Sequence, residues 1–209
     1  ALRANFLTVK NTAVALQQLA AFHRHEFHFP IIGITGSNGK TIVKEWLNFL
    51  LSPDYNIIKS PKSYNSQVGV PLSVLGISQN HNLGIFEAGI SKVGEMQNLE
   101  TIIKPTIGIL TNIGSAHDEG FENWEQKTAE KLKLFANSEV LIYQKTDLVD
   151  VLIPENVKTY SWSFDNANAD VFIQIKKNTL IINNKDAVEI DFVDHASIEN
   201  AINCLMIML

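Results

Sequence analysis

Gly36-Ser37-Asn38-Gly39-Lys40-Thr41 is the most informative segment of this chain. It directly follows a short apolar run at residues 30–35 and opens the segment 41–51, whose apolar residues recur at helical spacing. A strand, a glycine-rich loop and a helix in this order are typical of a phosphate-binding P-loop. Backbone N–H groups at the start of the helix hold the phosphate oxygens, and glycine lets the backbone approach them closely.

The residue types in this loop match the chemistry of nucleotide phosphates. Lys40 would reach the β- and γ-phosphates, and the Thr41 hydroxyl would ligate Mg²⁺. The loop has the shorter Thr-Gly-x-x-Gly-Lys-Thr form, because Ile34 stands where the longer P-loop pattern has its first glycine. An ordinary GTPase is not indicated, since no guanine-reading Asn-Lys-x-Asp segment occurs. The predicted nucleotide-binding residues are Gly36, Ser37, Asn38, Gly39, Lys40 and Thr41.

Outward from the loop, apolar runs alternate with helical patterns through much of the chain. Further strands are predicted at residues 56–59, 83–86, 106–111 and 139–143. Between them, helical spacing occurs at residues 71–75, 95–103 and 123–135. This alternation predicts an α/β fold, in which helices flank a mostly parallel P-loop sheet on both faces.

The two ends of the chain carry other patterns. Before the loop, Asn11 or Thr12 can cap a helix whose predicted apolar stripe is Val14, Leu16, Leu19, Ala20 and Phe22. Near the C-terminus, residues 170–174, 179–183 and 187–192 predict a small antiparallel β meander. An apolar helix over residues 197–209 then reaches the last residue without a stop signal, so we expect the chain to be part of a longer protein.

Composition narrows the class of protein. Of the 209 residues, 45% are hydrophobic and 19% are charged, which suits a packed core and excludes general disorder. A net charge of −5 argues against a nucleic-acid partner. Cys204 is the single cysteine, so no internal disulfide forms and a reducing compartment is indicated. Since no apolar run approaches the roughly 20 residues of a membrane helix, we expect a cytoplasmic domain without membrane insertion.

Several polar residues outside the loop are candidates for the site. Glu87 follows the predicted strand 83–86, at the sheet edge where such folds bind ligands, and there it could hold Mg²⁺. His117 lies in a polar loop after the predicted strand 106–111, where a neutral imidazole could ligate a metal or contact substrate, although a surface histidine is the plain alternative. Lys131 borders the apolar face of the predicted helix 123–135, and its charge pattern alone indicates a solvated side chain.

Two asparagines and two arginines complete the candidates. Asn65 is a polar loop residue with several uses, and Asn200 lies near the start of the last predicted helix, where a surface position is the alternative. Arg3 and Arg24 are the only arginines, and both precede the P-loop. An arginine on the γ-phosphate would therefore come from another domain or chain, unless Arg24 folds back onto the loop.

Several segments, taken in order, resemble the Mur ligases. The stretch from Ile34 to Thr41, with Val43-Lys44-Glu45 after it, resembles the ATP loop of that family. The other similar segments are residues 65–71, 87–89, 116–121, 131–135 and 197–201. The set covers about residues 30–205, and it is most similar to the members of the family that add D-alanyl-D-alanine.

The resemblance implies roles for the weaker candidates. Thr41 and Glu87 would hold the Mg²⁺ that bridges the β- and γ-phosphates, and His117 and Lys131 would hold a second Mg²⁺. Lys131 would be carbamylated, which turns a cation into a carboxylate-like anion and explains a lysine beside a metal. The implied catalytic residues are Lys40, His117 and Lys131.

The resemblance also implies a reaction and its partners. The expected activity is ATP-dependent joining of D-Ala-D-Ala to UDP-N-acetylmuramoyl-tripeptide through an acyl phosphate, a step in making peptidoglycan precursors for the cell wall. Asn200 would contact adenine, and Asn65 would face the peptide substrate. We expect residues 1–29 to be a lead-in from a preceding domain boundary and residues 30–209 to be the central ATPase domain.

Such ligases have two flanking domains, one for the UDP-sugar and one that closes on the nucleotide, and neither matches this chain. We therefore expect no ligation from the isolated chain. Another Mur ligase or a folylpolyglutamate synthase, which uses a related central domain, is an alternative of the same class. A nucleotide-binding module that hydrolyses nothing and regulates a partner is an alternative of a different class.

Overall fold

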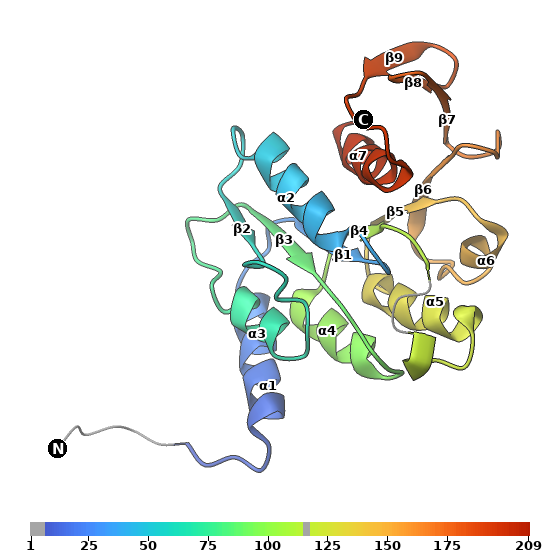
Figure 1. Ribbon diagram of the computed structural model, residues 1–209. Coiled ribbons are helices and arrows are strands. Elements are labelled where there is room, and N and C mark those ends of the chain that lie inside the picture. Colours follow the sequence, from blue (N-terminus) through green and yellow to red (C-terminus); the bar gives the residue numbers. More distant parts are fainter. Residues whose placement is uncertain (1–6, 115–117) are drawn as a thin grey trace.

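The computed structural model describes residues 7–114 and 118–209 (Figure 1). The strands are β1 (Ile31–Thr35), β2 (Ile57–Lys59), β3 (Leu83–Glu87), β4 (Ile107–Leu110), β5 (Val140–Gln144), β6 (Lys158–Ser163), β7 (Val171–Lys176), β8 (Thr179–Ile182) and β9 (Asp186–Glu189). The α-helices are α1 (Thr12–His25), α2 (Lys40–Leu51), α3 (Gly69–Val74), α4 (Glu95–Ile103), α5 (Trp124–Leu132), α6 (Asp147–Asp150) and α7 (His195–Met208). Short 3₁₀ turns are η1 (Asp118–Gly120) and η2 (Lys133–Phe135).

Within the described residues the strands form one sheet in the order β2-β3-β1-β4-β5-β6-β7-β8-β9. Neighbours from β2 to β7 pair in parallel, whereas β7, β8 and β9 pair antiparallel. From β1 the chain runs to β2 and β3 on one side of β1, and it later forms β4 on the other side of β1. The strand order therefore reverses between β1 and β4, and the carboxyl ends of parallel strands at such a reversal form a ligand-binding crevice.

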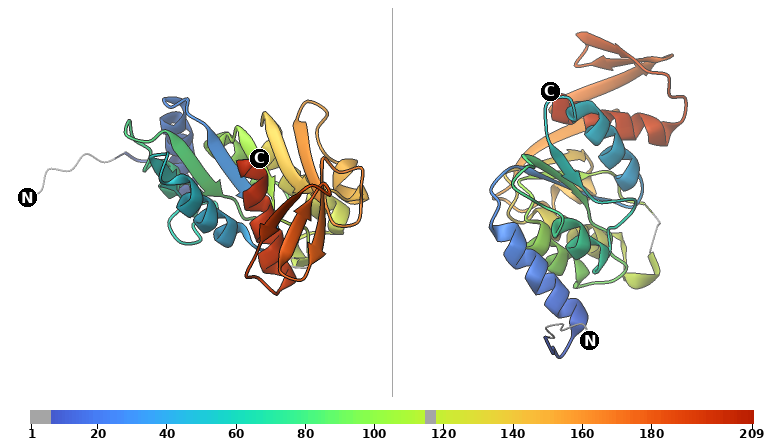
Figure 2. Two further views of the ribbon diagram at one scale, coloured as in Figure 1. Left: turned by 90° about the horizontal axis from the view of Figure 1, so that it is seen from above. Right: turned by 90° about the vertical axis from the view of Figure 1, so that its left-hand side faces the viewer.

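Helices cover both faces of the sheet (Figure 2). Along each buried strand, alternate residues point to opposite faces, so Ile31 and Phe86 enter one core while Ile32 and Ile85 enter the other. The first core also takes residues of α1, α3, α4 and α5, and the second takes residues of α2, α7 and the β7–β9 meander. Across the part of the chain that the structure describes, no helix is both long and apolar enough to cross a bilayer.

The predicted α/β class, the mostly parallel sheet and the antiparallel meander are all confirmed. The strand β6 was not expected, although it joins the meander to the main sheet through parallel pairs with β5 and β7. Its segment alternates polar residues with Tyr160 and Trp162, which is the pattern of a half-buried strand. Trp162 is fully buried and donates through Nε1 to Asn203 Oδ1 at 3.2 Å.

The expected apolar stripe of α1 is wrong in part. Asn11 caps this helix as predicted, but Leu19 and Phe22 are 57% and 71% exposed. The buried side of α1 carries Ala20 and Arg24, four residues apart and therefore on one face. The sequence pattern failed here because a guanidinium, rather than an apolar side chain, fixes the orientation of the helix.

Arg24 ties α1 to the end of α4 and lies away from the P-loop. Its guanidinium donates to the carbonyl oxygens of Ile103 (3.0 Å), Lys104 (3.4 Å) and Phe27. Burial lowers the pKa of this side chain. The alternative in which Arg24 folds back onto the phosphate loop is therefore wrong.

Replacing Arg24 by alanine should lower the free energy of unfolding by about 2 to 4 kcal/mol, because buried carbonyls lose their donor and the packed stem is lost. Urea unfolding followed by circular dichroism measures the change. The exposed Lys10, just before α1, offers a matched control as Lys10→Ala, which should stay within about 0.5 kcal/mol. A loss below 0.5 kcal/mol for Arg24→Ala would contradict this assignment.

Candidate nucleotide and metal site

The P-loop lies between β1 and α2 at the carboxyl edge of the sheet, and two of its residues require glycine. Gly36 has φ +147° and Gly39 has φ +81°, which other residues rarely adopt. A Cβ on Gly36 would lie 1.9 Å from Thr111 Oγ1, and one on Gly39 would lie 2.1 Å from Asn200 Oδ1. Both positions therefore need glycine, for its backbone conformation and for its lack of a side chain.

The segment that follows β4 holds the P-loop in place. Asn112 accepts from Ser37 N through its carbonyl (2.9 Å) and from Asn38 N through Oδ1 (3.0 Å). The Thr111 hydroxyl donates to Asn38 O at 2.5 Å, and Ser37 Oγ exchanges hydrogen bonds with the backbone of Gly114. The loop is thus fixed before a ligand binds. The first N–H groups of α2, which have no intrahelical acceptor, are the donors that a phosphate at this helix N-terminus would use.

Lys40 lies over this loop. Its Nζ donates to the carbonyl oxygens of Gly36 (2.8 Å) and Ser37 (3.1 Å). Burial is the main cause that lowers the pKa of Lys40; Glu87 opposes this shift and Lys127 adds to it. Among the described residues, the hydrogen-bond acceptors of this ammonium are neutral backbone carbonyls, which a phosphate oxygen can replace.

Thr41 and Glu87 meet at the edge of the sheet as expected. The Thr41 hydroxyl donates to Glu87 Oε2 at 2.8 Å, and Glu87 is fully buried in register with Ile34 of β1. A buried carboxylate beside a hydroxyl is a pair of hard oxygen donors, which is the ligand chemistry of Mg²⁺. These two residues fit a magnesium ion shared with a nucleotide in the loop.

Lys131 reaches the same loop from α5. Its Nζ donates to Gly36 O at 3.1 Å, and the residue is 2% exposed. Burial first, then the nearby charges of Lys40 and Lys127, lower the pKa of Lys131 to about 7. Lys127, one turn earlier, donates to a carbonyl of the neighbouring loop. The predicted partner of Lys131 is His117, which lies outside the described residues.

The two candidate asparagines also lie at this edge. Asn65 Nδ2 is 3.5 Å from Glu87 Oε2, and its carbonyl accepts from Gly89 N at 2.7 Å. Asn200 is 5% exposed, and its amide packs on Gly39. Every predicted site residue that the structure describes is therefore within one cluster around the P-loop.

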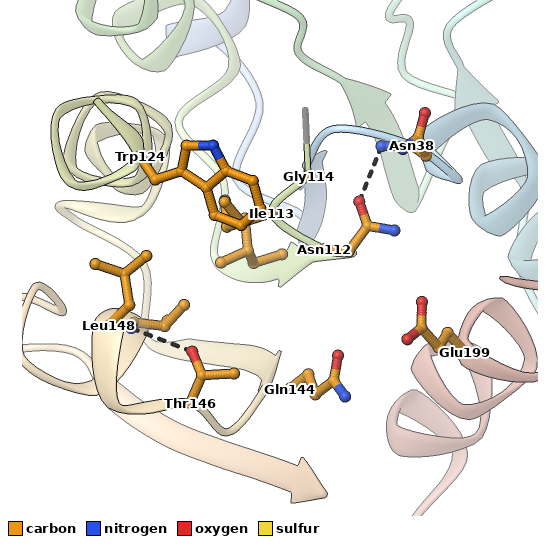
Figure 3. Close-up of a pocket in the computed structure, with 11 residues that line it drawn as sticks. Asn38, Asn112, Ile113, Gly114, Trp124, Gln144, Thr146, Leu148 and Glu199 are labelled. Carbon is orange, nitrogen blue, oxygen red and sulfur yellow. Dashed lines mark hydrogen bonds between the residues drawn. The ribbon is translucent and has the colours of Figure 1, made fainter. Parts of the chain in front are cut away.

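A cavity of about 400 Å³ opens beside this cluster (Figure 3). It lies between the P-loop and the loops after β4 and β5, at the reversal of strand order. Its lining includes Asn38, Asn112, Trp124, Gln144, Thr146 and Glu199. Figure 3 shows the Trp124 ring on one side and the Glu199 carboxylate of α7 on another. Its place next to the phosphate loop suits the base and ribose of a nucleotide.

A family model for the Mur ligase middle domain matches residues 34–208. The chain belongs to the Mur ligase family. The relative from Borreliella burgdorferi, named UDP-N-acetylmuramoyl-tripeptide–D-alanyl-D-alanine ligase, is 37% identical over 175 residues, which are 80% of this chain and 38% of that protein. A relative of the same name from Synechocystis sp. is 40% identical over 153 residues, which are 73% of this chain and 32% of that protein.

A solved structure shares the fold of this Mur ligase domain. The MurF ligase from Thermotoga maritima in complex with ADP has a TM-score of 0.85 and 23% identity, and the match covers 100% of this chain and 51% of that one. This chain thus spans about two fifths or less of the two curated relatives and about half of the solved chain. The activity and substrates of the full-length protein are therefore proposals.

The structure adds three residues to the site of this Mur ligase domain that were not predicted from the sequence. Lys44 is fully buried and contacts Glu87 at 3.1 Å, and Thr111 and Asn112 hold the P-loop. A signal for Lys44 was present, because a residue three positions after Thr41 shares its helix face. Thr111 and Asn112 directly follow a parallel strand next to β1, which places them at the same edge.

Replacing Gly36 by alanine should lower the free energy of unfolding by about 2 to 4 kcal/mol, because backbone strain adds to a clash with Thr111. Gly94→Ala is a matched control: Gly94 also has positive φ, +89°, but a Cβ there meets nothing within 4 Å. The control should cost only about 1 kcal/mol of strain. Equal losses in urea unfolding for the two variants would contradict the role given to the close approach.

Proposed function

We propose that this chain is the ATP-binding central domain of an ATP-dependent ligase that joins D-Ala-D-Ala to UDP-N-acetylmuramoyl-tripeptide. The observation that carries the proposal is the meeting of Lys40, Thr41, Glu87 and Lys131 around one phosphate loop. Relatives at 37% and 40% identity, which carry the name of that ligase, support the choice of substrates.

ATP would bind with its phosphates on the P-loop and its base toward the cavity beside Asn38. In this position Lys40 leaves the carbonyls of Gly36 and Ser37 and pairs with the β- and γ-phosphates. Asn200, which packs on the loop, is the proposed adenine contact. The ADP held by the similar Thermotoga maritima structure supports a nucleotide in this fold.

The metal role is proposed for two pairs of residues. Thr41 and Glu87 would hold one Mg²⁺, and Lys131 with His117 would hold a second. Bound Mg²⁺ supplies charge neutralisation of the phosphates. For Lys131 we propose a carbamate, since an ammonium would repel a metal ion. The neutral amine attacks the carbon of CO₂, an N–C bond replaces one N–H bond, and a proton is released to solvent. In the described residues no three His, Cys, Asp or Glu side chains cluster, so a ligand set for this edge needs other oxygen donors.

The reaction would proceed in two transfers. A carboxylate oxygen of the tripeptide attacks the γ-phosphorus of ATP, and ADP leaves. The amine of D-Ala-D-Ala then attacks the acyl carbon, and inorganic phosphate leaves with the electron pair of the broken C–O bond. Lys40 stabilises the charge that develops on the transferred phosphoryl group. Asn65, beside Glu87, would orient the peptide end that carries the reacting carboxylate.

The remaining parts of the enzyme would lie outside residues 1–209. We propose that flanking domains of the full-length protein bind the UDP-sugar and close over the nucleotide. They would also supply an arginine to the phosphates, because Arg24 is used in packing. Joining these domains to the chain would convert nucleotide binding into ligation.

The test is ADP and phosphate release by the intact protein with defined substrates. Release that requires both UDP-N-acetylmuramoyl-tripeptide and D-Ala-D-Ala supports the proposal. Release with another amino acid in place of D-Ala-D-Ala, or with a folate and glutamate, would reassign the substrates within the same reaction class. Nucleotide binding without ADP release under any of these conditions would favour a regulatory module and contradict a ligase.

A further inference from the structure

Lys44 is a fully buried lysine whose ammonium faces three oxygens. Its Nζ lies 3.1 Å from Glu87 Oε1 and 3.3 Å from Glu45 Oε1, and it donates to Lys62 O. An ammonium has three protons and no acceptor capacity, so these three oxygens match its whole donor set. Unlike Lys40, this lysine is committed to protein groups and has no donor left for a phosphate.

The two carboxylate oxygens of Glu87 have different partners, because one of them faces Lys44. Oε1 faces the Lys44 ammonium, whereas Oε2 accepts from the Thr41 hydroxyl at 2.8 Å and lies 3.5 Å from Asn65 Nδ2. The carboxylate plane is thereby fixed, with one oxygen turned to the P-loop and the other turned away from it.

The other sides of the Lys44 ammonium face Glu45 and the carbonyl of Lys62. The Glu45 carboxylate lies between Lys44 and Lys59, and the hydrogen bond from Lys59 is the largest cause that lowers the pKa of Glu45. Glu45 therefore stays ionised at neutral pH and holds the outer side of the Lys44 ammonium. The carbonyl oxygen of Lys62, in the loop that leads to Asn65, accepts a hydrogen bond from the Lys44 ammonium.

We propose that Lys44 is a positioning residue that limits Glu87 to ligation through Oε2 alone and thereby selects Mg²⁺ over Ca²⁺. This inference rests on the proposed role of Glu87 as a metal ligand. Mg²⁺ takes an octahedral set in which carboxylates bind through one oxygen, whereas Ca²⁺ takes six to eight oxygens and readily uses both oxygens of a carboxylate. Since both ions carry the same charge, the ammonium repels them equally, and only the orientation of the carboxylate discriminates between them.

The experiment compares Mg²⁺ and Ca²⁺ binding to the intact protein saturated with ADP, by isothermal titration calorimetry. In the unaltered protein Mg²⁺ should bind more tightly. In Lys44→Met the affinity ratio of Mg²⁺ to Ca²⁺ should fall by about tenfold or more, within the range for loss of a group that orients a metal ligand. Lys59→Met, the same change at the outer end of the ion-pair chain, is the matched control and should leave the ratio within about twofold.

Several outcomes overturn the inference. An equal change of both affinities in Lys44→Met would reveal a charge effect only, and an unchanged ratio would reveal a purely structural lysine. Equal or tighter binding of Ca²⁺ by the unaltered protein refutes selection without any variant. Lys44→Leu, which also removes every donor to Glu87, replaces Lys44→Met if the latter does not fold, and the same fall is expected.

Glu87→Gln separates this inference from the proposed function. If Glu87→Gln leaves Mg²⁺ binding intact, the metal role of Glu87 fails, and the Lys44 inference fails with it. If Glu87→Gln abolishes Mg²⁺ binding while the Lys44 variants keep the ratio, only the Lys44 inference fails.

Discussion

Replacing Lys40 by methionine should lower the kcat of the intact protein in the proposed ligation by about a thousandfold, the scale expected when a charge that stabilises a phosphoryl transition state is lost. Methionine keeps most of the length of the stem and removes the ammonium. The Nζ lies on the carbonyls of Gly36 and Ser37, at the mouth of the loop that would take the phosphates. Initial rates of ADP formation at saturating substrates measure the effect.

The fall should appear mainly in kcat rather than in KM for ATP, because the charge interacts most strongly with the phosphoryl group during transfer. Lys92→Met, at an exposed position of the loop after β3, is the control and should keep full activity. An unchanged kcat in Lys40→Met would contradict a catalytic role for the P-loop.

Replacing Lys131 by alanine should lower activity by about a hundredfold or more, because the site loses the group proposed to face the second metal ion. The environment prepares this lysine for reaction with CO₂. With its pKa lowered to about 7, a substantial fraction of the amines is neutral at pH 7. An exposed lysine has only roughly one neutral amine in three thousand at that pH.

The proposed carbamate would make the activity depend on CO₂, which gives a second measurement for Lys131. Removing CO₂ and bicarbonate should lower the activity of the unaltered enzyme and leave that of Lys131→Ala unchanged. Short carboxylic acids added to Lys131→Ala should restore part of the activity. Carbamate occupancy should fall as the pH drops below about 7, since the protonated amine does not react with CO₂.

Lys133→Ala is the matched control for Lys131, because it changes a lysine two positions along the chain. Lys133 is 42% exposed and pairs with Glu130 at 2.5 Å, so its loss should leave activity within about twofold. An active Lys131→Ala enzyme, or a variant that no short acid restores, would count against the carbamate.

The edge of the sheet that carries the P-loop could be predicted from the sequence, because short-range sequence patterns determine it. A short apolar strand followed by glycines, Lys40 and Thr41 has one common structural solution, and Glu87 at the end of another parallel strand must share its edge. The strand β6 and the buried face of α1 depended on tertiary contacts. Arg24 shows why, since two of its three carbonyl partners, Ile103 and Lys104, lie 79 and 80 residues away in the sequence.

The lysines of the site were harder to predict than its glycines. Charge patterning alone indicates a solvated side chain for Lys131 and gives no role to Lys44, yet both are buried against the P-loop edge. Burial of a lysine depends on which carbonyls and carboxylates the fold places around it, here Gly36 O for Lys131 and Glu87 for Lys44. For Lys131 the resemblance to Mur ligases provided the only sequence signal.

The most direct measurement is a crystal structure of the intact protein with Mg²⁺ and a non-hydrolysable ATP analogue. In this structure Lys40 Nζ should leave the carbonyls of Gly36 and Ser37 for the β- and γ-phosphates, and Mg²⁺ should contact Thr41 Oγ1 and Glu87 Oε2. The base should lie in the cavity beside Asn38. A nucleotide bound elsewhere, or bound while Lys40 stays on the loop carbonyls and no metal contacts Glu87, would contradict the assignment of this edge as the ATP site.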